Sequence, residues 1–337
     1  MGASPPVSVL LPVRDGARHL SQAIASLEAQ TDGDFEVVAV DDGSSDATPE
    51  LLADWKGRDG RVRVLRQDPA GIVAALERAR AQARGTFLAR MDADDRAEPH
   101  RLESQRRLAE ADASLAVVGA WIRYFPRTEV RAGARRYESW LNGSAFPEEV
   151  ERELFVECPL AHPTFFMRAE SVDAVGGYRD RGWPEDYDLI LRLWAAGGRL
   201  AKVPEVLLHW REGADRLHRT DPRYAPDAFV RCKVHHLRRT LLSQGRPVAV
   251  WGAGPVGKAF ARALTDAGTP VRAFVEVDPR KIGQEIHGAP VLDTEGGLAL
   301  EGVLHLAAVG QPGARETLRG ILSDGGRVEM RDFVAVA

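Results

Sequence analysis

The segment Thr86–Arg101, with the sequence TFLARMDADDRAEPHR, decides the fold predicted for this chain. Its first part, Thr86–Met91, is an apolar run of strand length, and three carboxylates follow it directly: Asp92, Asp94 and Asp95. In an open α/β sheet, ligands bind outside the carboxyl ends of the strands. A strand that ends in carboxylates therefore indicates a hard cation, Mg²⁺ or Mn²⁺, because both ions prefer oxygen ligands. An acidic surface turn is the alternative interpretation of this segment taken alone.

The sequence before this segment alternates between strand and helix patterns. A continuous apolar run at residues 7–13 predicts a buried parallel strand, and further strands are predicted at 35–40 and 61–66. Helical patterns follow at 17–30 and 71–84. This alternation predicts an α/β fold with a mostly parallel, doubly wound sheet.

A second acidic cluster, Asp41–Asp46, follows the strand at residues 35–40. Its serines and its last aspartate are good N-cap residues for the next helix, so part of the cluster has a structural explanation. Capping does not explain Asp42. We expect Asp42 at the same edge of the sheet as the carboxylates that follow residue 91, since the carboxyl ends of parallel strands share one edge.

Composition indicates a globular protein with two domains. The chain has 337 residues, of which 44% are hydrophobic and 28% charged, and it is too long for a typical single core. The net charge of −4, without long blocks of like charge, excludes an electrostatic footprint for nucleic acid. The two cysteines, Cys158 and Cys232, have no metal-ligand spacing and favour a reducing compartment. The sequence shows no signal peptide or membrane-spanning run, so we expect a cytoplasmic protein.

Four short pieces occur in one order and spacing: VLLPV at 9–13, QT at 30–31, VDDGSSD at 40–46 and RMDADD at 90–95. Together they resemble the family 2 glycosyltransferases with the GT-A fold of nucleotide-diphospho-sugar transferases. The resemblance implies metal-dependent, inverting transfer of a sugar from a nucleoside-diphosphate sugar, with uridine as the commonest base. The acceptor would be a hydroxyl group in polysaccharide or glycoconjugate synthesis, on a glycan or a lipid-linked acceptor.

The resemblance also implies which residues bind the donor and the metal ion. Asp42 is expected to contact the base of the nucleoside-diphosphate sugar, and Pro12 belongs to the same donor site. Asp92 and Asp94 form a D-x-D motif whose Mn²⁺ or Mg²⁺ ion binds the diphosphate. Asp95 is a further candidate ligand for that ion.

A second acidic motif, GWPEDYDL at 182–189, lies downstream. Pro184 fits the first turn of a helix, where the helix dipole stabilises carboxylates, and this alone is one interpretation of the motif. The match to the acidic E-D motif of the family instead implies catalysis, because an inverting transfer needs one base to take the acceptor proton. Asp186 is the predicted base. Glu185 and Trp183 are predicted to bind the acceptor, Trp183 by stacking on a sugar face.

Other residues remain open between two interpretations. His162, in CPLAHPT at 158–164, is an acceptor-binding group by resemblance and a structural histidine otherwise. Trp183 also fits a core or lid position. At position 77 this chain has a glutamate where many members of the resembled family carry an asparagine. This difference concerns selectivity for the donor, and not membership of the glycosyltransferase class. The charged stretch 127–146 is expected to form a loop over the site.

The C-terminal region carries a different motif, VAVWGAGPVGKAFARAL at 248–264. Its G-x-G-x-x-G pattern, at Gly252, Gly254 and Gly257, follows a strand and opens a helix, and Glu276 ends the next strand about 20 residues on. We therefore expect a small Rossmann-like α/β domain that holds a nucleotide. A scaffold whose glycines serve packing alone and an NAD(P)-dependent oxidoreductase are the alternatives. The oxidoreductase ranks last because only about 90 residues remain after residue 247, too few to add a substrate domain.

The predicted domains are residues 1–212 for the transferase, 213–245 for a loop and helical linker, and 246–337 for the Rossmann-like domain. Within the linker, residues 221–244 are predicted to pass from a Pro-rich loop into a basic amphipathic helix. Such a helix can lie on an anionic membrane, which would suit a lipid-linked acceptor. A helix packed against protein, with a solvated basic face, is the alternative.

Overall fold

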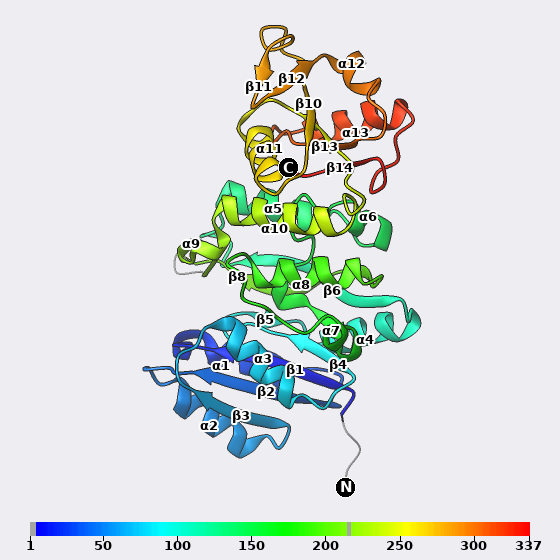
Figure 1. Cartoon of the computed structure of the whole chain (residues 1–337). Helices are drawn as coiled ribbons and strands as arrows, with labels where there is room; N and C mark the ends of the chain where they lie inside the picture. The colour runs from blue at the N-terminus through cyan, green and yellow to red at the C-terminus, as the bar shows by residue number, and fades with distance from the viewer. Residues whose placement is uncertain (1–4, 214–216) are drawn as a thin grey trace. The chain divides into compact units, whose positions relative to one another are not determined.

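The computed structural model describes residues 5–213 and 217–337, which form two compact units with one main sheet each (Figure 1). The predicted domain boundaries after residues 212 and 245 remain a proposal. Both units are discontinuous in sequence. The first comprises Met1–Glu151, Pro159–Arg181 and Glu185–Thr220, and the second comprises Arg152–Cys158, Gly182–Pro184 and Asp221–Ala337.

Four parallel strands form one side of the first sheet. β1 (Val7–Val13) lies between β2 (Phe35–Asp42) and β4 (Phe87–Arg90), and β3 (Val62–Gln67) lies outside β2. β1, β2 and β4 are almost entirely buried because helices cover both faces of a parallel sheet. The expected mostly parallel α/β sheet is confirmed, and its strands end within about two residues of the sequence-based expectation.

The other side of this sheet is mixed. β7 (Phe166–Arg168) is antiparallel to β4 and to β6 (Leu115–Phe125), whereas β8 (Arg199–Arg211) runs parallel to β6. The short β5 (Arg96–Ala97) pairs with β8, with Arg96 opposite His209. The chain that follows the D-x-D motif is thereby fixed to the end of β8.

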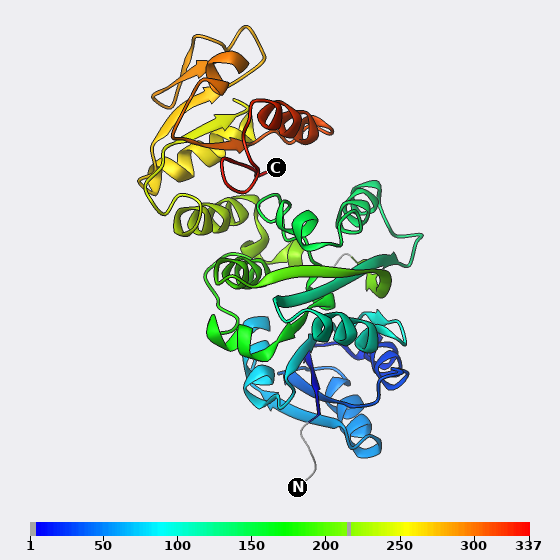
Figure 2. The same ribbon diagram turned by 90° about the vertical axis from the view of Figure 1, so that its right-hand side faces the viewer.

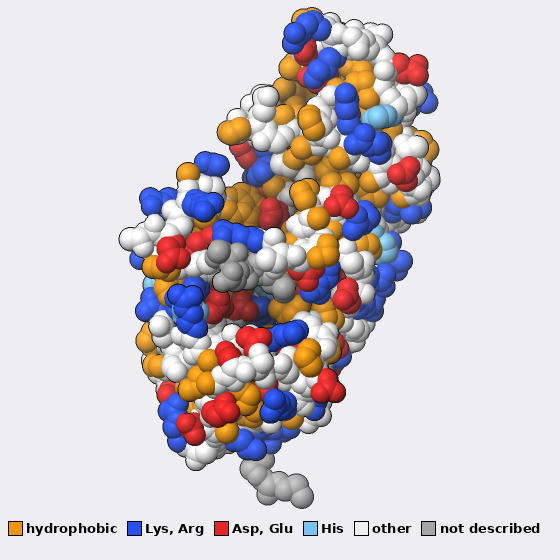
Figure 3. Space-filling view, turned by 90° about the vertical axis from the view of Figure 1, so that its left-hand side faces the viewer, with side chains coloured by type: hydrophobic (Ala, Val, Ile, Leu, Met, Phe, Trp, Pro, Cys, Tyr) orange, Lys and Arg blue, Asp and Glu red, His pale blue; other side chains and the backbone are white. Residues whose placement is uncertain are grey.

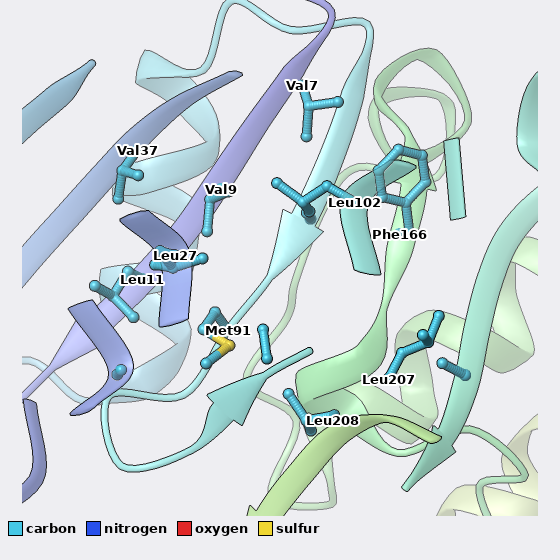
Figure 4. Close-up of a cluster of buried hydrophobic side chains, with 14 of the residues drawn as sticks. Val7, Val9, Leu11, Leu27, Val37, Met91, Leu102, Phe166, Leu207 and Leu208 are labelled. Atoms are coloured by element: carbon cyan, nitrogen blue, oxygen red, sulfur yellow. The ribbon is translucent and has the colours of Figure 1, made fainter. Parts of the chain in front are cut away.

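Helices cover both faces of the sheet (Figure 2). The main core lies on the face covered by α1 (Ala17–Glu28), α2 (Thr48–Arg58) and α4 (Arg101–Ala111). α3 (Ile72–Gln82) packs against β1 and β2. Successive residues of a strand point to opposite faces, which is why alternate β1 residues enter this core. Figure 4 shows part of the core, including Val7, Val9, Leu11, Leu27, Val37, Met91, Leu102 and Phe166.

The stretch 127–146 differs from the expected loop because it contains a helix, α5 (Ala132–Leu141). Tyr137, Trp140 and Leu141 are spaced three and four residues apart, so they share one side of the helix and pack on the core. The high charge of the stretch hid this short apolar pattern. The remaining helices of the first unit are α6 (Pro147–Glu151), α7 (Ala169–Ala174), α8 (Glu185–Ala195), α9 (Leu217–Thr220) and the 3₁₀ turn η1 (His162–Thr164).

The second unit contains a smaller α/β sheet with five parallel strands and one antiparallel edge strand, in the order β11-β12-β10-β9-β13-β14. The strands are β9 (Val248–Trp251), β10 (Val271–Val275), β11 (Glu285–Ile286), β12 (Ala289–Leu292), β13 (Leu304–Ala307) and β14 (Phe333–Ala335). The helices are α10 (Pro226–Arg239), α11 (Pro255–Asp266), α12 (Thr294–Leu298) and α13 (Ala314–Asp324), with the 3₁₀ turn η2 (Pro222–Tyr224) before them.

Among the described residues, every helix is too short or too polar to cross a membrane. In α10, Cys232, Val234 and Leu237 on the apolar side are buried, and the helix packs on α11. This burial favours the packed alternative for the basic helix. Membrane contact stays a prediction.

Candidate active site

Three carboxylates gather where β4 ends. Oxygen atoms of Asp92, Asp94 and Asp95 lie within 4.8 Å of one another. Bond lengths of about 2.1 Å place ligands on opposite sides of a Mg²⁺ ion roughly 4 Å apart, so these oxygens fit a single small cation. The set consists of hard oxygen donors, which suits Mg²⁺ or Mn²⁺. On one face of the molecule, acidic side chains line a hollow that basic side chains border (Figure 3).

Strand β8 holds the loop that carries these carboxylates. The backbone N–H of Arg211 donates to Oδ1 of Asp95 at 2.7 Å, and Nε of Arg211 donates to the backbone oxygen of Asp94 at 2.7 Å. The Arg211 guanidinium also lies over the Phe125 ring, 4.3 Å from its centre. The positively charged Arg211 side chain is thus fixed beside the acidic loop.

Asp42 lies at the end of β2, and its carboxylate is 3% exposed. Oδ1 accepts hydrogen bonds from Gln67 Nε2 at 2.7 Å and from the N–H of Ala70 at 2.8 Å, while Oδ2 accepts from the N–H of Gly71 at 2.9 Å. These bonds fix the turn that leads into α3. Pro12, on the neighbouring strand, pairs with Val40 in register. Donor binding by Asp42 and Pro12 stays a prediction.

The rest of the second acidic cluster anchors helices, as its capping chemistry suggested. Asp46 accepts from the N–H of Ala17 at the start of α1 and from the N–H of Thr48 at the start of α2. Burial opposes ionisation of Asp46, but hydrogen bonds from Thr48 and the backbone outweigh it and lower the pKa of the carboxyl. Asp46 thus anchors α1 and α2, whereas Asp42 bonds to the turn before α3.

His162 connects several elements of the first unit. The residue opens η1, and its ring is buried. Nε2 lies 3.0 Å from the Tyr178 hydroxyl, and Nδ1 lies 3.9 Å from Oε1 of Glu185. Burial, and then the charge of Arg90, hold the pKa of His162 well below its usual value. The imidazole is therefore neutral at neutral pH, so one ring nitrogen donates and the other accepts a hydrogen bond.

The acidic motif of residues 185–186 forms the first turn of α8, directly after Pro184. Glu185 is fully buried, whereas Asp186 is half-buried and one of its oxygens accepts the N–H of Tyr187 at 2.8 Å. Asp188 is buried and paired with Arg192 at 2.7 Å. Of the three carboxylates in this turn, Asp186 is thus the more accessible one. This accessibility suits a residue that must reach an acceptor hydroxyl.

Glu77 has a structural role that sequence reasoning did not foresee. Its carboxylate accepts the backbone N–H of Tyr178 at 2.6 Å and is paired with Arg80 at 2.6 Å. The residue therefore holds the segment that carries Tyr178 against α3. Tyr178 in turn contacts His162, so the departure from asparagine affects this network.

The arginines that flank the D-x-D motif were also missed. Arg90 is 3% exposed and its Nη1 lies 2.5 Å from Oδ2 of Asp92. Arg101, 1% exposed, donates to Gln105, to Met91 Sδ and to the backbone oxygen of Arg90. A charged residue inside an otherwise apolar strand run is the sequence signal that could have identified Arg90.

Trp183 belongs to the second unit, together with Gly182 and Pro184. Its ring centre lies 5.2 Å from that of His235 in α10, and Arg231 donates to the backbone oxygen of Gly182 at 3.2 Å. The structure thus shows a packing contact for Trp183. Stacking on an acceptor sugar stays a prediction.

The glycine motif of the second unit forms the turn between β9 and α11. A Cβ atom on Gly257 would lie 1.9 Å from the backbone oxygen of Gly252, so only glycine permits this strand–helix approach. A Cβ on Gly254 would meet no atom within 4 Å. Glu276 accepts from the N–H of Ala253 at 3.1 Å and from Lys281 at 3.0 Å. Burial opposes ionisation of Glu276, but these hydrogen bonds outweigh it and lower the pKa of the carboxyl.

Comparison with known proteins defines the class to which this fold and site belong. The profile of glycosyl transferase family 2 matches residues 8–176. The protein EpsE of Bacillus subtilis (strain 168) is 29% identical over 68% of this chain and 81% of its own length. The amylovoran biosynthesis glycosyltransferase AmsE of Erwinia amylovora is 26% identical over 61% of this chain and 75% of its own length.

Solved structures show the same fold at low sequence identity. TarS 1–349 of S. aureus, in complex with UDP-GlcNAc, aligns over 78% of this chain and 81% of its own, with a TM-score of 0.57 and 15% identity. The mannosyltransferase PcManGT of Pyrobaculum calidifontis, in complex with GDP-Man and Mn²⁺, aligns over 79% and 76%, with a TM-score of 0.52 and 18% identity. The fold is therefore the GT-A fold.

The chain belongs to glycosyl transferase family 2, and it is a glycosyltransferase. This membership confirms the family resemblance drawn from residues 9–95.

Proposed function

We propose that the first unit transfers a sugar from a nucleoside-diphosphate sugar to an acceptor hydroxyl, with inversion at the anomeric carbon and with a divalent metal ion. The observation that carries this proposal is the convergence of the Asp92, Asp94 and Asp95 carboxylates within 4.8 Å of one another at the end of β4. The fit of these oxygens to a hard cation supports metal dependence.

The residues of the site have separate roles in this proposal. Asp92, Asp94 and Asp95 hold the metal ion, which would neutralise the charge that develops on the departing diphosphate. Asp42 and Pro12 bind the nucleoside. Asp186 takes the proton of the acceptor hydroxyl as its oxygen attacks the anomeric carbon. Glu185, His162 and Trp183 are proposed to bind the acceptor.

The relatives support a nucleotide-sugar donor. TarS has been solved with UDP and UDP-GlcNAc, and PcManGT with GDP-Man and Mn²⁺. UDP-sugars are the first donors to test, and GDP-sugars the second. The name of AmsE places that relative in the biosynthesis of amylovoran, which supports a glycan or lipid-linked acceptor here.

A thermal-shift screen of UDP- and GDP-sugars, with and without Mn²⁺, tests the proposal. A ligand that binds the native state raises the melting temperature, by an amount that grows with its concentration over Kd. We expect one donor class to stabilise the protein, and to do so only when Mn²⁺ is present. If the donor raises the melting temperature equally in Mn²⁺ and in EDTA, metal dependence is contradicted. NMR analysis of the anomeric configuration of the product would test inversion.

For the second unit, the proposal is an accessory nucleotide site at Gly252, Gly254, Gly257 and Glu276. The open space beside Gly254 supports it, because a diphosphate could approach the backbone there. The same screen with NAD(H), NADP(H) and CoA separates the alternatives. No shift with any of them would leave the glycines a packing role alone, and hydride transfer with NAD(P)H would favour the oxidoreductase.

A further inference from the structure

Two buried arginines flank the metal motif, and their guanidinium groups have different surroundings. Arg101 uses its nitrogens in three hydrogen bonds, to Gln105 Oε1 at 3.0 Å, Met91 Sδ at 3.2 Å and the backbone oxygen of Arg90 at 2.7 Å. Arg90 instead directs Nη1 to Oδ2 of Asp92, 2.5 Å away. Nε of Arg90 is inaccessible to water and has no hydrogen-bond acceptor.

Such an arrangement is costly for the folded state of the protein. Buried N–H groups are nearly always hydrogen-bonded, and a buried charge needs a partner of opposite sign. Arg90 has that partner in Asp92, whereas its buried Nε has no hydrogen-bond acceptor. A structural arginine would resemble Arg101, with each donor directed at an oxygen or sulfur atom. The Arg90 side chain is therefore oriented toward the Asp92 carboxylate rather than toward the best set of backbone acceptors.

The position of Arg90 also relates it to the second acidic motif. Its charge acts on His162 and on the Tyr178 hydroxyl, which lie 3.0 Å from each other. His162 in turn lies 3.9 Å from Glu185. The buried Arg90 charge thus acts both on the Asp92 carboxylate and on the His162–Tyr178 pair.

We propose that Arg90 is a positioning residue of the metal site: it holds the Asp92 carboxylate in the orientation in which it binds the cation. This inference rests on the proposed metal-dependent function. Groups that hydrogen-bond or pair with a metal-ligating carboxylate orient it, and their loss typically lowers metal affinity by about 10- to 100-fold. Loss of the Arg90 charge would by itself raise the affinity of the site for a cation, because the charge repels the ion. A lower affinity after its removal therefore indicates that Arg90 positions the carboxylate.

The test measures Mn²⁺ affinity directly, from the loss of the EPR signal of free Mn²⁺ in the presence of UDP or GDP. We expect Arg90→Met to weaken the apparent Kd for Mn²⁺ by about 10- to 100-fold. Arg90→Lys should lose less, because an ammonium keeps the charge without the planar guanidinium geometry. Arg101→Met is the matched control: it removes a neighbouring buried guanidinium that has no direct contact with a carboxylate of the motif, and we expect its apparent Kd to stay within about threefold of wild type.

Activity provides a second readout. In Arg90→Met, the Mn²⁺ concentration for half-maximal rate should rise while kcat at saturating Mn²⁺ is largely retained. A general loss of structure would lower kcat at every Mn²⁺ concentration. Should Arg90→Met fail to fold, Arg90→Lys carries the test.

Three outcomes would count against the inference. Wild-type affinity in Arg90→Met, or in Arg90→Lys if only that variant folds, would overturn it while leaving the proposed function intact. Equal weakening in Arg101→Met would show that the effect is structural. An absence of Mn²⁺ binding by the wild-type protein with both nucleotides would overturn the metal-dependent function, and this inference with it.

Discussion

Nδ1 of His162 lies 3.9 Å from Oε1 of Glu185, so the turn after residue 161 and the first turn of α8 meet inside the first unit. Both side chains are buried. This contact places the histidine beside Glu185, the neighbour in sequence of the proposed base Asp186, without exposing it to water. Burial of the ring in the folded protein lowers the pKa of His162 and keeps the imidazole neutral.

Replacement of Asp94 should remove the metal dependence of the reaction. Asp94→Asn keeps the shape of the side chain but not its charge, and the affinity of the site for a hard cation depends on charged oxygen ligands. We expect the Mn²⁺-dependent rise in melting temperature to disappear. Turnover should fall by at least about 100-fold, since Lewis-acid stabilisation is worth several kcal/mol. Asp54→Asn, on the exposed side of α2, is the control and should retain both properties.

Replacement of Asp186 should separate binding from chemistry. Loss of a general base typically costs about 10²- to 10⁴-fold in rate, and Asp186→Ala leaves the carboxylates of the D-x-D motif intact. We therefore expect a lower kcat by that factor and an unchanged Kd for the nucleoside diphosphate in calorimetry. Normal sugar transfer by this variant would show that the assignment of the base is wrong.

The burial of His162 predicts a pH dependence of stability. Its pKa is lower in the folded protein than the ordinary value of 6.5, because burial and Arg90 disfavour the charged ring. The folded state therefore binds fewer protons than the unfolded state, and stability is lost as pH falls below 6.5. His162→Gln should lose less stability than wild type between pH 7 and pH 5. Identical pH profiles of the unfolding midpoint would contradict the burial of a neutral ring.

The burial of Lys233 in α10 predicts that stability also depends on pH in the alkaline range. Its Nζ donates to the backbone oxygens of Val156 at 2.6 Å and Val336 at 3.0 Å, and burial lowers its pKa to about 8 from 10.5. The folded state loses this proton first, so stability of the second unit should rise between pH 8 and pH 10.5. The gain relative to Lys233→Met is at most about 3 kcal/mol. Hydrogen exchange of α10 amides measures it, and a flat difference between the two proteins would refute the shift.

Local sequence patterns determined the strands and the acidic residues at their ends. The apolar runs at residues 7–13, 35–40 and 86–91 became β1, β2 and β4, because a parallel sheet covered by helices on both faces needs continuous apolar strands. The carboxyl ends of such strands share one edge, which explains why Asp92, Asp94 and Asp95 could be expected at a common site. The family followed from the same motifs.

Only the tertiary structure decided which side chains meet. The contacts of His162 with Tyr178 and Glu185 depend on where η1 and α8 lie in three dimensions, and helical or strand periodicity carries no information on such distances. The same holds for the packing of Trp183 beside His235, and for the pairing of Arg90 with Asp92 rather than with a backbone oxygen. Periodicity predicts which face of an element is buried. Which group lies next to a buried charge depends on how all the surrounding elements pack in three dimensions.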